Sequence, residues 1–143
     1  MFKKILVPVD GSEYANSAID YACDIANKFK SELTFICIVP PPIIFGAEAG
    51  IIDFKPLENA GKTILDSSNK LAATKGFKPI LRLETGQAAD KIIQIAKDEE
   101  YELIIIGSRG MSAVRSFLLG SVSDKVSHHA SCPVLIVRWY SAE

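Results

Sequence analysis

The sequence lacks features that would assign it to particular compartments or partners. Its net charge is only −1, so no bulk attraction to nucleic acid or to an acidic membrane is expected. No apolar run approaches the roughly 18 residues of a membrane-spanning helix, and no signal-type segment precedes the first apolar run. The three cysteines (Cys23, Cys37, Cys132) are an odd number without a Cys-x-x-Cys pair, and each lies within an apolar pattern. We therefore expect reduced, buried thiols in a soluble, cytoplasmic protein.

Several catalytic motifs are also missing. The chain has no Gly-Lys-Ser/Thr ending of a Walker A loop, no compact Gly-x-Gly-x-x-Gly of NAD-binding domains, and no Gly-x-Ser-x-Gly elbow of hydrolases. His128 and His129 are adjacent, so on a helix they point to different sides, and no third metal ligand has suitable spacing. We expect them to be surface and partly buried helix residues rather than metal ligands.

Short apolar runs alternate with amphipathic segments along the chain. The 143 residues, 48% apolar and 23% charged, suit one globular domain spanning 1–143. Apolar runs predict strands at 5–9, 33–39, 79–84, 103–106 and 133–137. Helical spacing of apolar residues predicts helices at about 15–26, 57–75 (with Gly76 as its C-cap), 87–100 and 122–130, the last with His129 on its inner face.

This alternation predicts an α/β fold: a single open five-stranded parallel sheet with helices on both faces. The run 79–84 looks like an edge strand, because it contains a proline and places Leu81 and Leu83 inward and Arg82 and Glu84 outward. The strand order 3-2-1-4-5 follows. Ligands of such sheets bind where the winding reverses, here between the first and fourth strands.

The segment after the fourth predicted strand has the character of a phosphate-binding loop. It reads Gly107-Ser108-Arg109-Gly110, nine further residues, then Gly120-Ser121 and a helix start. Glycine lets main-chain N–H groups approach a ligand, and the first turn of a helix has unpaired N–H donors and a partial positive charge. Ser121 and Ser123 add hydroxyl donors, and Arg109 adds a cation. We predict phosphate binding at 107–123, the alternative being ordinary turn glycines and a solvated Arg109.

Two further features allow two interpretations each. Asp10 ends the first strand, where it either caps the following helix through an Asp10-x-x-Glu13 capping box or holds Mg²⁺ that bridges phosphates. Residues 40–56 form a long, apolar, proline- and glycine-bearing link. Such a link either covers the site or a partner, or packs over the core of its own domain.

The pattern Gly-2x-Gly-9x-Gly-Ser, with Ile-Leu-Val-Pro-Val-Asp-Gly-Ser near the start and Cys-Pro-Val-Leu-Ile-Val near the end, resembles the ATP-binding branch of the universal stress protein family. The resemblance spans Lys3 to Val137 and implies a five-stranded parallel sheet that is Rossmann-like and of the adenine nucleotide-binding type, a homodimer and bound ATP. Two departures lie on the adenine side. Cys37 stands where many relatives have histidine, and 40–56 is a variable region without a transferable role.

The resemblance also implies roles for individual positions. Pro8, Val9 and Asp10 match the family's first-strand loop, and Asp10 lies near the adenine or the metal and phosphates. Val9 and Ile38 match positions that line the adenine. The ribose and phosphates are matched by Ile106, Gly107, Ser108, Arg109 and Gly110, and the phosphate chain by Gly120, Ser121, Val122 and Ser123.

The last predicted strand bears on assembly. In a monomer, 133–137 would be an exposed apolar sheet edge, and antiparallel pairing with a second copy would remove it. Alternatively, Trp139-Tyr140 and the tail fold over this edge.

The leading functional hypothesis is a dimeric ATP-binding stress-response regulator with little or no turnover, its ligands being ATP and Mg²⁺. The alternatives are a slow ATPase or phosphoryl-transfer enzyme, with Asp10 on the metal and Arg109 stabilising charge, and an interaction module that binds a protein partner through 40–56.

Overall fold

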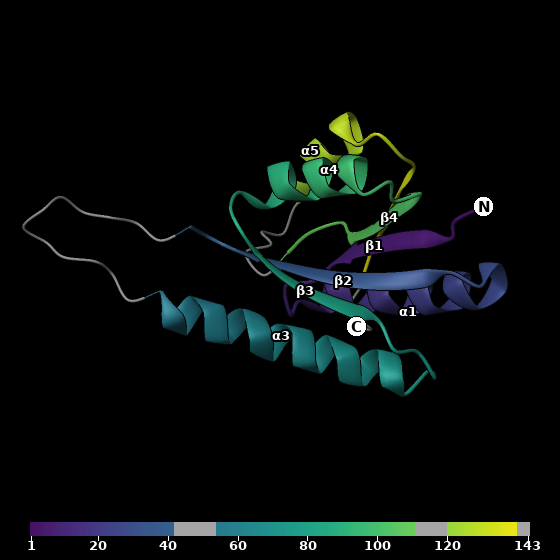
Figure 1. The fold of residues 1–143 in the computed structure, drawn as a ribbon, viewed down its shortest axis with the longest axis horizontal. Coiled ribbons are helices and arrows are strands. Elements are labelled where there is room, and N and C mark those ends of the chain that lie inside the picture. The colour runs from purple at the N-terminus through teal and green to yellow at the C-terminus, as the bar shows by residue number, and fades with distance from the viewer. Residues whose placement is uncertain (42–53, 111–119, 140–143) are drawn as a thin grey trace, which may run out of the picture.

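The computed structural model describes residues 1–41, 54–110 and 120–139 (Figure 1). Strands and helices alternate along these residues, as the apolar pattern predicts. The strands are β1 (Lys4–Pro8), β2 (Glu32–Val39), β3 (Ile80–Thr85), β4 (Leu103–Gly107) and β5 (Val134–Val137), and the helices are α1 (Glu13–Phe29), α3 (Lys55–Ala73), α4 (Ala88–Asp98) and α5 (Ser121–His129).

The strands form one parallel sheet in the order β3-β2-β1-β4-β5, which confirms the predicted topology. Helices α4 and α5 lie on one face of the sheet, and α1 and α3 lie on the other (Figure 1). The winding reverses between β1 and β4, so the carboxyl ends of these two strands bring the loops after Pro8 and Gly107 to the same edge of the sheet.

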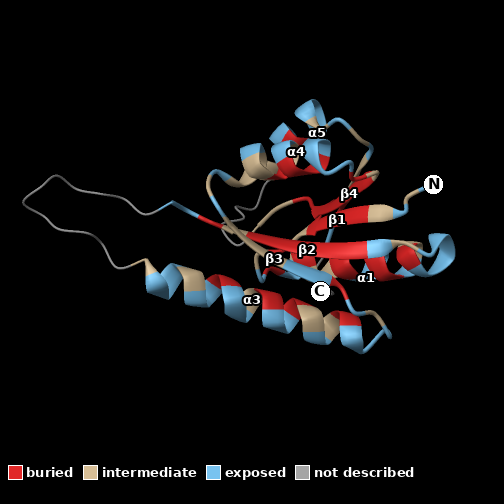
Figure 2. Ribbon diagram, in the orientation of Figure 1, coloured by how far each residue is buried: buried red, intermediate tan, exposed pale blue. Residues whose placement is uncertain are grey.

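Each face of the sheet has its own apolar core, because helices cover both faces. Ile5, Val7 and Phe35 belong to the core beneath α1 and α3, whereas Leu6 and Ile104 belong to the core beneath α4 and α5. The central strands are accordingly buried along most of their length (Figure 2). Burial on both faces explains why these strands appear in the sequence as continuous apolar runs rather than as alternating patterns.

Helix α3 ends at Ala73 with Thr74 as its C-cap, two residues before the predicted end, and Gly76 lies in the turn that follows. Gly76 has a φ of +82°, its N–H donates to the carbonyl of Ala73 (3.0 Å), and the N–H of Phe77 donates to the carbonyl of Ala72 (3.0 Å). This is the hydrogen-bond pattern of a Schellman turn, which favours glycine at the left-handed position.

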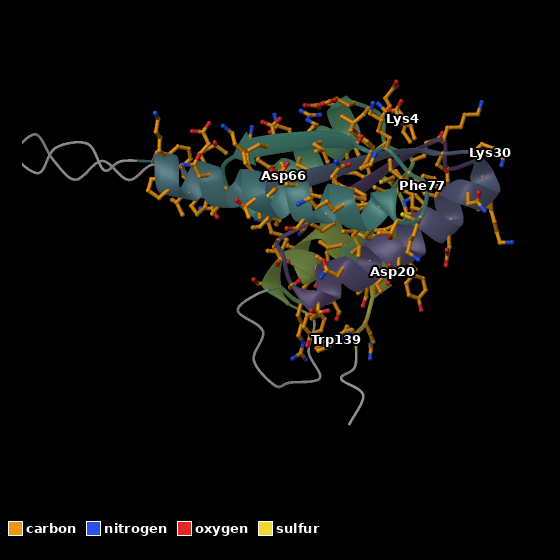
Figure 3. All side chains as sticks on the ribbon, turned by 90° about the horizontal axis from the view of Figure 1, so that it is seen from below. Lys4, Asp20, Lys30, Asp66, Phe77 and Trp139 are labelled. Atoms are coloured by element: carbon orange, nitrogen blue, oxygen red, sulfur yellow. The ribbon has the colours of Figure 1, made fainter. Side chains whose placement is uncertain are left out.

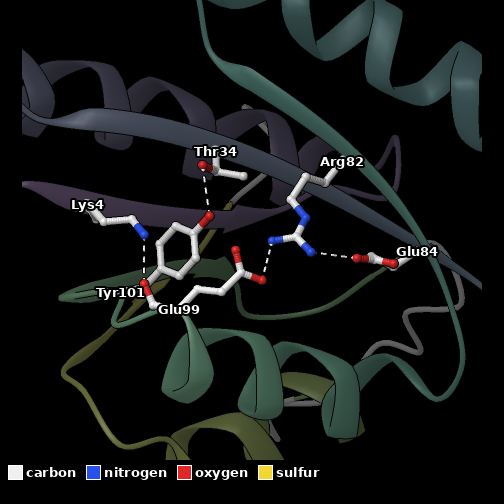
Figure 4. Close-up of polar contacts among 6 residues, drawn as sticks. All are labelled: Lys4, Thr34, Arg82, Glu84, Glu99 and Tyr101. Carbon is white, nitrogen blue, oxygen red and sulfur yellow. Dashed lines mark hydrogen bonds and ion pairs between the residues drawn. The ribbon is translucent and has the colours of Figure 1, made fainter.

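The edge strand β3 differs in part from expectation. Leu83 packs against the core on the α1 and α3 side as predicted, but Leu81 is 37% exposed rather than inward. Arg82 donates to both Glu84 and Glu99 at 2.6 Å, which links β3 to the residue that follows α4 (Figure 4). Beside this network, the hydroxyl of Tyr101 donates to that of Thr34 (3.1 Å). Arg82 and Glu84 are therefore half-buried partners and not merely solvated charges.

Two further expectations concern His129, at the end of α5, and segments of the chain outside the described residues. His129 is exposed rather than inward, because it is the last residue of α5 and Val126 and Ala130 make the inner contacts. Most of the link 40–56, residues 111–119 of the predicted phosphate loop and the tail from Tyr140 lie outside the described residues. No helix within the described parts of the chain is long and apolar enough to cross a membrane.

Candidate functional site

The loops that follow β1 and β4 touch each other at the switch point of the sheet. A Cβ atom placed on Gly110 would collide with Oδ2 of Asp10. The structure therefore brings together the two loops that the sequence singles out. Any side chain at position 110 would have to displace the Asp10 carboxylate.

Ser108 links the loop after β4 to neighbouring elements through hydrogen bonds. Its carbonyl accepts hydrogen bonds from the N–H of Gly120 (2.7 Å) and from the hydroxyl of Ser123 (2.7 Å), both at the start of α5. Its N–H donates to the carbonyl of Val137 at the end of β5 (2.7 Å). These bonds hold the first turn of α5 directly beside residues 107–110.

The other two glycines of the motif are also positions of close approach. A Cβ on Gly107 would lie 2.8 Å from both Cβ and the carbonyl carbon of Tyr14, in the first turn of α1. A Cβ on Gly120 would lie 3.2 Å from Cα of Arg109 and from the carbonyl oxygen of Ser108. Both contacts are with backbone or with Cβ, which cannot move aside as the end of a flexible side chain would. Packing thus excludes a side chain at 107 and disfavours one at 120, whereas at 110 the obstacle is the movable carboxylate of Asp10.

The N-termini of α1 and α5 are satisfied differently. In α1, the hydroxyl of Ser12 accepts from the N–H of Ala15 (3.1 Å), and Oδ1 of Asp10 accepts from the N–H of Ser12 (3.0 Å). In α5 the N-cap is Gly120, which has no side chain to accept from the first turn. The N–H groups of Ser121 and Val122 have no acceptor within their own helix, so this end of α5 is suited to an anion.

Two sequence-based interpretations change at this point. The capping-box alternative for Asp10 is wrong, because Ser12 is the N-cap of α1 and Asp10 lies two residues before it. Ser123 is 2% exposed and its hydroxyl lies within hydrogen-bonding distance of the carbonyls of Ser108 and Gly120. Its single hydroxyl proton is therefore used inside the protein, and Ser123 shapes the loop rather than offering a donor to a ligand.

The apolar residues assigned to the site divide between the two faces of the sheet. Ile38, Ile106 and Val122 all pack on the α4 and α5 side, which is the side of the uncapped helix end. Val9 is 4% exposed and packs in the opposite core, so only its backbone can border a ligand on the α5 side. Pro8 is half-buried and, two residues after Leu6, lies on the α4 and α5 side of β1.

Cys37 lies close to Asp10 but on the α1 and α3 side. Burial, and to a smaller extent the negative charge of Asp10, raises the pKa of its thiol from 9.0 to about 11. The thiol is therefore protonated at neutral pH and behaves as a small apolar side chain. Gly61 of α3 packs over it, since a Cβ there would lie 3.7 Å from the sulfur and 2.5 Å from Leu83.

No group of three or more histidine, cysteine or acidic side chains that could hold a metal ion occurs within 1–41, 54–110 and 120–139. A metal at this corner would thus need ligand oxygens in addition to Asp10. Tyr14, which packs against Gly107 from the α1 side, is not among the residues predicted from the sequence. The sequence feature that points to Tyr14 is its position in the first turn of the helix that begins at the switch point.

Comparison with known proteins places the chain in a family. Residues 1–138 match the Universal stress protein family. The universal stress protein YxiE of Bacillus subtilis is 34% identical over 148 residues, covering 96% of this chain and 100% of that protein. Among solved structures, UspA from Lactobacillus plantarum has a TM-score of 0.78 at 24% identity (96% and 98% covered), and a universal stress protein in complex with cAMP has a TM-score of 0.74 at 26% identity (94% and 96% covered). The chain therefore belongs to the universal stress protein family.

Proposed function

We propose that this protein binds ATP at the corner formed by Asp10, the loop 107–110 and the first turn of α5, and acts as a nucleotide-dependent regulator with little or no turnover. The observation that supports the proposal is the hydrogen bonding of Ser108 to Gly120 and Ser123, which holds the loop 107–110 beside a helix start whose N-cap has no side chain. The complex of a universal stress protein with cAMP, 26% identical to this chain, supports an adenine nucleotide as the ligand.

Each part of the nucleotide has a suitable partner in this arrangement. The phosphates would lie on the N–H groups of Arg109 and Gly110 and of Ser121 and Val122, since the N–H of Ser108 already donates to Val137. Arg109, half-buried in the same loop, would supply positive charge. The base would lie against Ile38 and Ile106, on the same face of the sheet.

Asp10 fits a supporting role for Mg²⁺ bound to the phosphates. Mg²⁺ is commonly held by one or two carboxylates together with phosphate oxygens, and Asp10 is placed beside Gly110, where those oxygens would lie. The same contact favours a second candidate function, slow hydrolysis of ATP, in which the metal would neutralise developing charge. We favour binding over turnover because the histidines of α5 lie exposed at the far end of that helix, away from the loop.

The binding proposal is tested by thermal unfolding with ATP, with and without Mg²⁺. A ligand at a hundred times its Kd stabilises the folded state by about 2.7 kcal/mol, which is a shift of several degrees in Tm. Gly110→Val should abolish the shift, because the new side chain occupies the space of the Asp10 carboxylate and the approach to the loop.

The matched control is Gly76→Ala. Gly76 has a φ of +82°, and a Cβ placed on it would meet nothing within 4 Å, so the substitution strains the backbone far from the site. It should lower the free energy of unfolding by about 1 kcal/mol, and with it Tm, yet leave the ATP-induced shift in Tm intact. The proposal would be contradicted if ATP did not change the Tm of the wild type, or if the Gly110→Val variant kept the full shift in Tm.

A further inference from the structure

An aromatic pair joins the start of α1 to the residue that lies two positions beyond β5. The rings of Tyr14 and Trp139 meet edge to face, with centroids 5.6 Å apart and planes at 75°. Trp139 is the only tryptophan of the chain and is 36% exposed. Seen from below the sheet, it lies beside the beginning of α1 (Figure 3).

Tyr14 is in direct contact with the proposed phosphate loop. A Cβ on Gly107 would lie 2.8 Å from Cβ of Tyr14 and 2.9 Å from its carbonyl oxygen, so the two residues already pack against each other without a gap. Close-packed groups transmit displacement because they cannot be compressed. Any movement of Gly107 toward α1 must therefore move Tyr14.

Trp139 is connected to the same loop by a second route. The N–H of Ser108 donates to the carbonyl of Val137 (2.7 Å), and Gly107 is the register partner of Val137 in the sheet. Leu135 and Val137 pack in the core on the α1 side, and two residues further on Trp139 meets Tyr14 of that helix. Loop, β5 and α1 thus form a closed chain of contacts.

We propose that Tyr14 and Trp139 are positioning residues for the loop 107–110, and that nucleotide binding at the loop is coupled to the packing of Trp139 on Tyr14. The inference rests on the proposed nucleotide function and adds its regulation. A phosphate held by the main-chain N–H groups of Arg109 and Gly110 restrains the adjoining Gly107 and Ser108, and through them both ends of the aromatic pair. The coupling is reciprocal, so loosening the pair weakens nucleotide binding.

The experiment measures the same event in two ways. Isothermal calorimetry gives the Kd for ATP, and tryptophan emission follows Trp139 during the same titration without added fluorophore. In the wild type, the emission should change and saturate with the calorimetric Kd. Tyr14→Ala keeps the backbone and Cβ that contact Gly107 but removes the ring that meets Trp139, so it should weaken ATP binding by about fivefold or more and reduce the emission change. Trp139→Phe, which keeps an aromatic ring against Tyr14, should bind within about twofold of the wild type.

Tyr21→Ala is the matched control, since Tyr21 is an aromatic residue of the same helix that is 55% exposed. It should leave both the Kd and the emission change unaltered. All titrations are run well below Tm, so that a purely structural loss of stability does not alter the Kd. ATP binding without an emission change, or with a wild-type Kd in Tyr14→Ala, overturns this inference alone. Absence of ATP binding to the wild type overturns the proposed function and the inference with it.

Discussion

Asp10 has different neighbours on its two carboxylate oxygens. Oδ1 accepts from the N–H of Ser12 (3.0 Å), which orients the side chain, and Oδ2 lies against Gly110. One oxygen thus serves the local turn, while the other faces the loop that we assign to phosphates. Because the two oxygens have different neighbours, a substitution that keeps one oxygen can separate the geometric role of Asp10 from its charge.

Asp10→Asn should reduce the affinity for Mg²⁺–ATP by about tenfold, or 1.4 kcal/mol, and leave AMP binding unchanged. Asparagine keeps an oxygen for the N–H of Ser12, so the turn survives, but it removes the negative charge that a metal needs. Calorimetry with Mg²⁺–ATP, with ATP and EDTA, and with AMP measures the difference.

The control for this substitution is Asp20→Asn, on the exposed side of α1, where the carboxylate pairs only loosely with Lys75 (3.6 Å). It should bind all three ligands as the wild type does. An equal loss for AMP and Mg²⁺–ATP in Asp10→Asn would contradict the metal role. Phosphate release by the wild type that disappears in Asp10→Asn at equal ATP binding would favour the hydrolytic alternative.

At the scale of elements, α5 is held to the loop after β4 by a contact that could not be predicted from the sequence of α5. Ser123 is buried, and its hydroxyl donates to the carbonyl of Ser108 across a gap of fifteen residues in the chain. Since the N-cap Gly120 has no side chain, this hydroxyl and the N–H of Gly120 set the distance between helix and loop. The position of α5 therefore depends on a residue in its first turn.

Ser123→Ala should lower the free energy of unfolding by about 1 kcal/mol and weaken ATP binding, because the Ser108 carbonyl loses one of its donors. Ser127→Ala tests the same chemical change on the same helix, where the hydroxyl is exposed and donates only to the carbonyl of Asp124 (2.8 Å). Urea unfolding and calorimetry of both variants give the comparison. Equal effects at the two positions would show that Ser123 has no special role in the site.

How far the sequence predicts these features depends on how local their causes are. The strands and helices follow from apolar spacing, and the order 3-2-1-4-5 follows from the edge character of β3, so both could be inferred without coordinates. The N-cap of α1 could not, because Asp10 and Ser12 both suit a cap and only backbone geometry decides between them. The burial of Ser123 and the contact of Tyr14 with Gly107 depend on how α5 and α1 pack on β4, which no local pattern reveals.

On the scale of the whole molecule, the two edges of the sheet are protected unequally. On β3, Arg82 and Glu84 place a paired charge on the edge strand, and Pro79 precedes it. Such residues discourage pairing with another chain. The opposite edge, β5, consists of four apolar residues, of which Val134, Leu135 and Ile136 are only half-buried in the isolated chain. Trp139, two residues beyond this strand, packs its ring against Tyr14 of α1.

We therefore expect a dimer in which β5 pairs with β5 of a second copy. The carbonyls of Pro133 and Val137 point to β4, so by the two-residue period of a strand Ile136 directs its N–H to the open edge. Ile136→Pro removes that donor and should convert the dimer to a monomer, whereas Ile136→Ala, which loses more of the side chain but keeps the N–H, should remain a dimer. Light scattering at micromolar concentrations distinguishes the two. A monomeric wild type, or a dimeric Ile136→Pro, would show that this edge is not the interface.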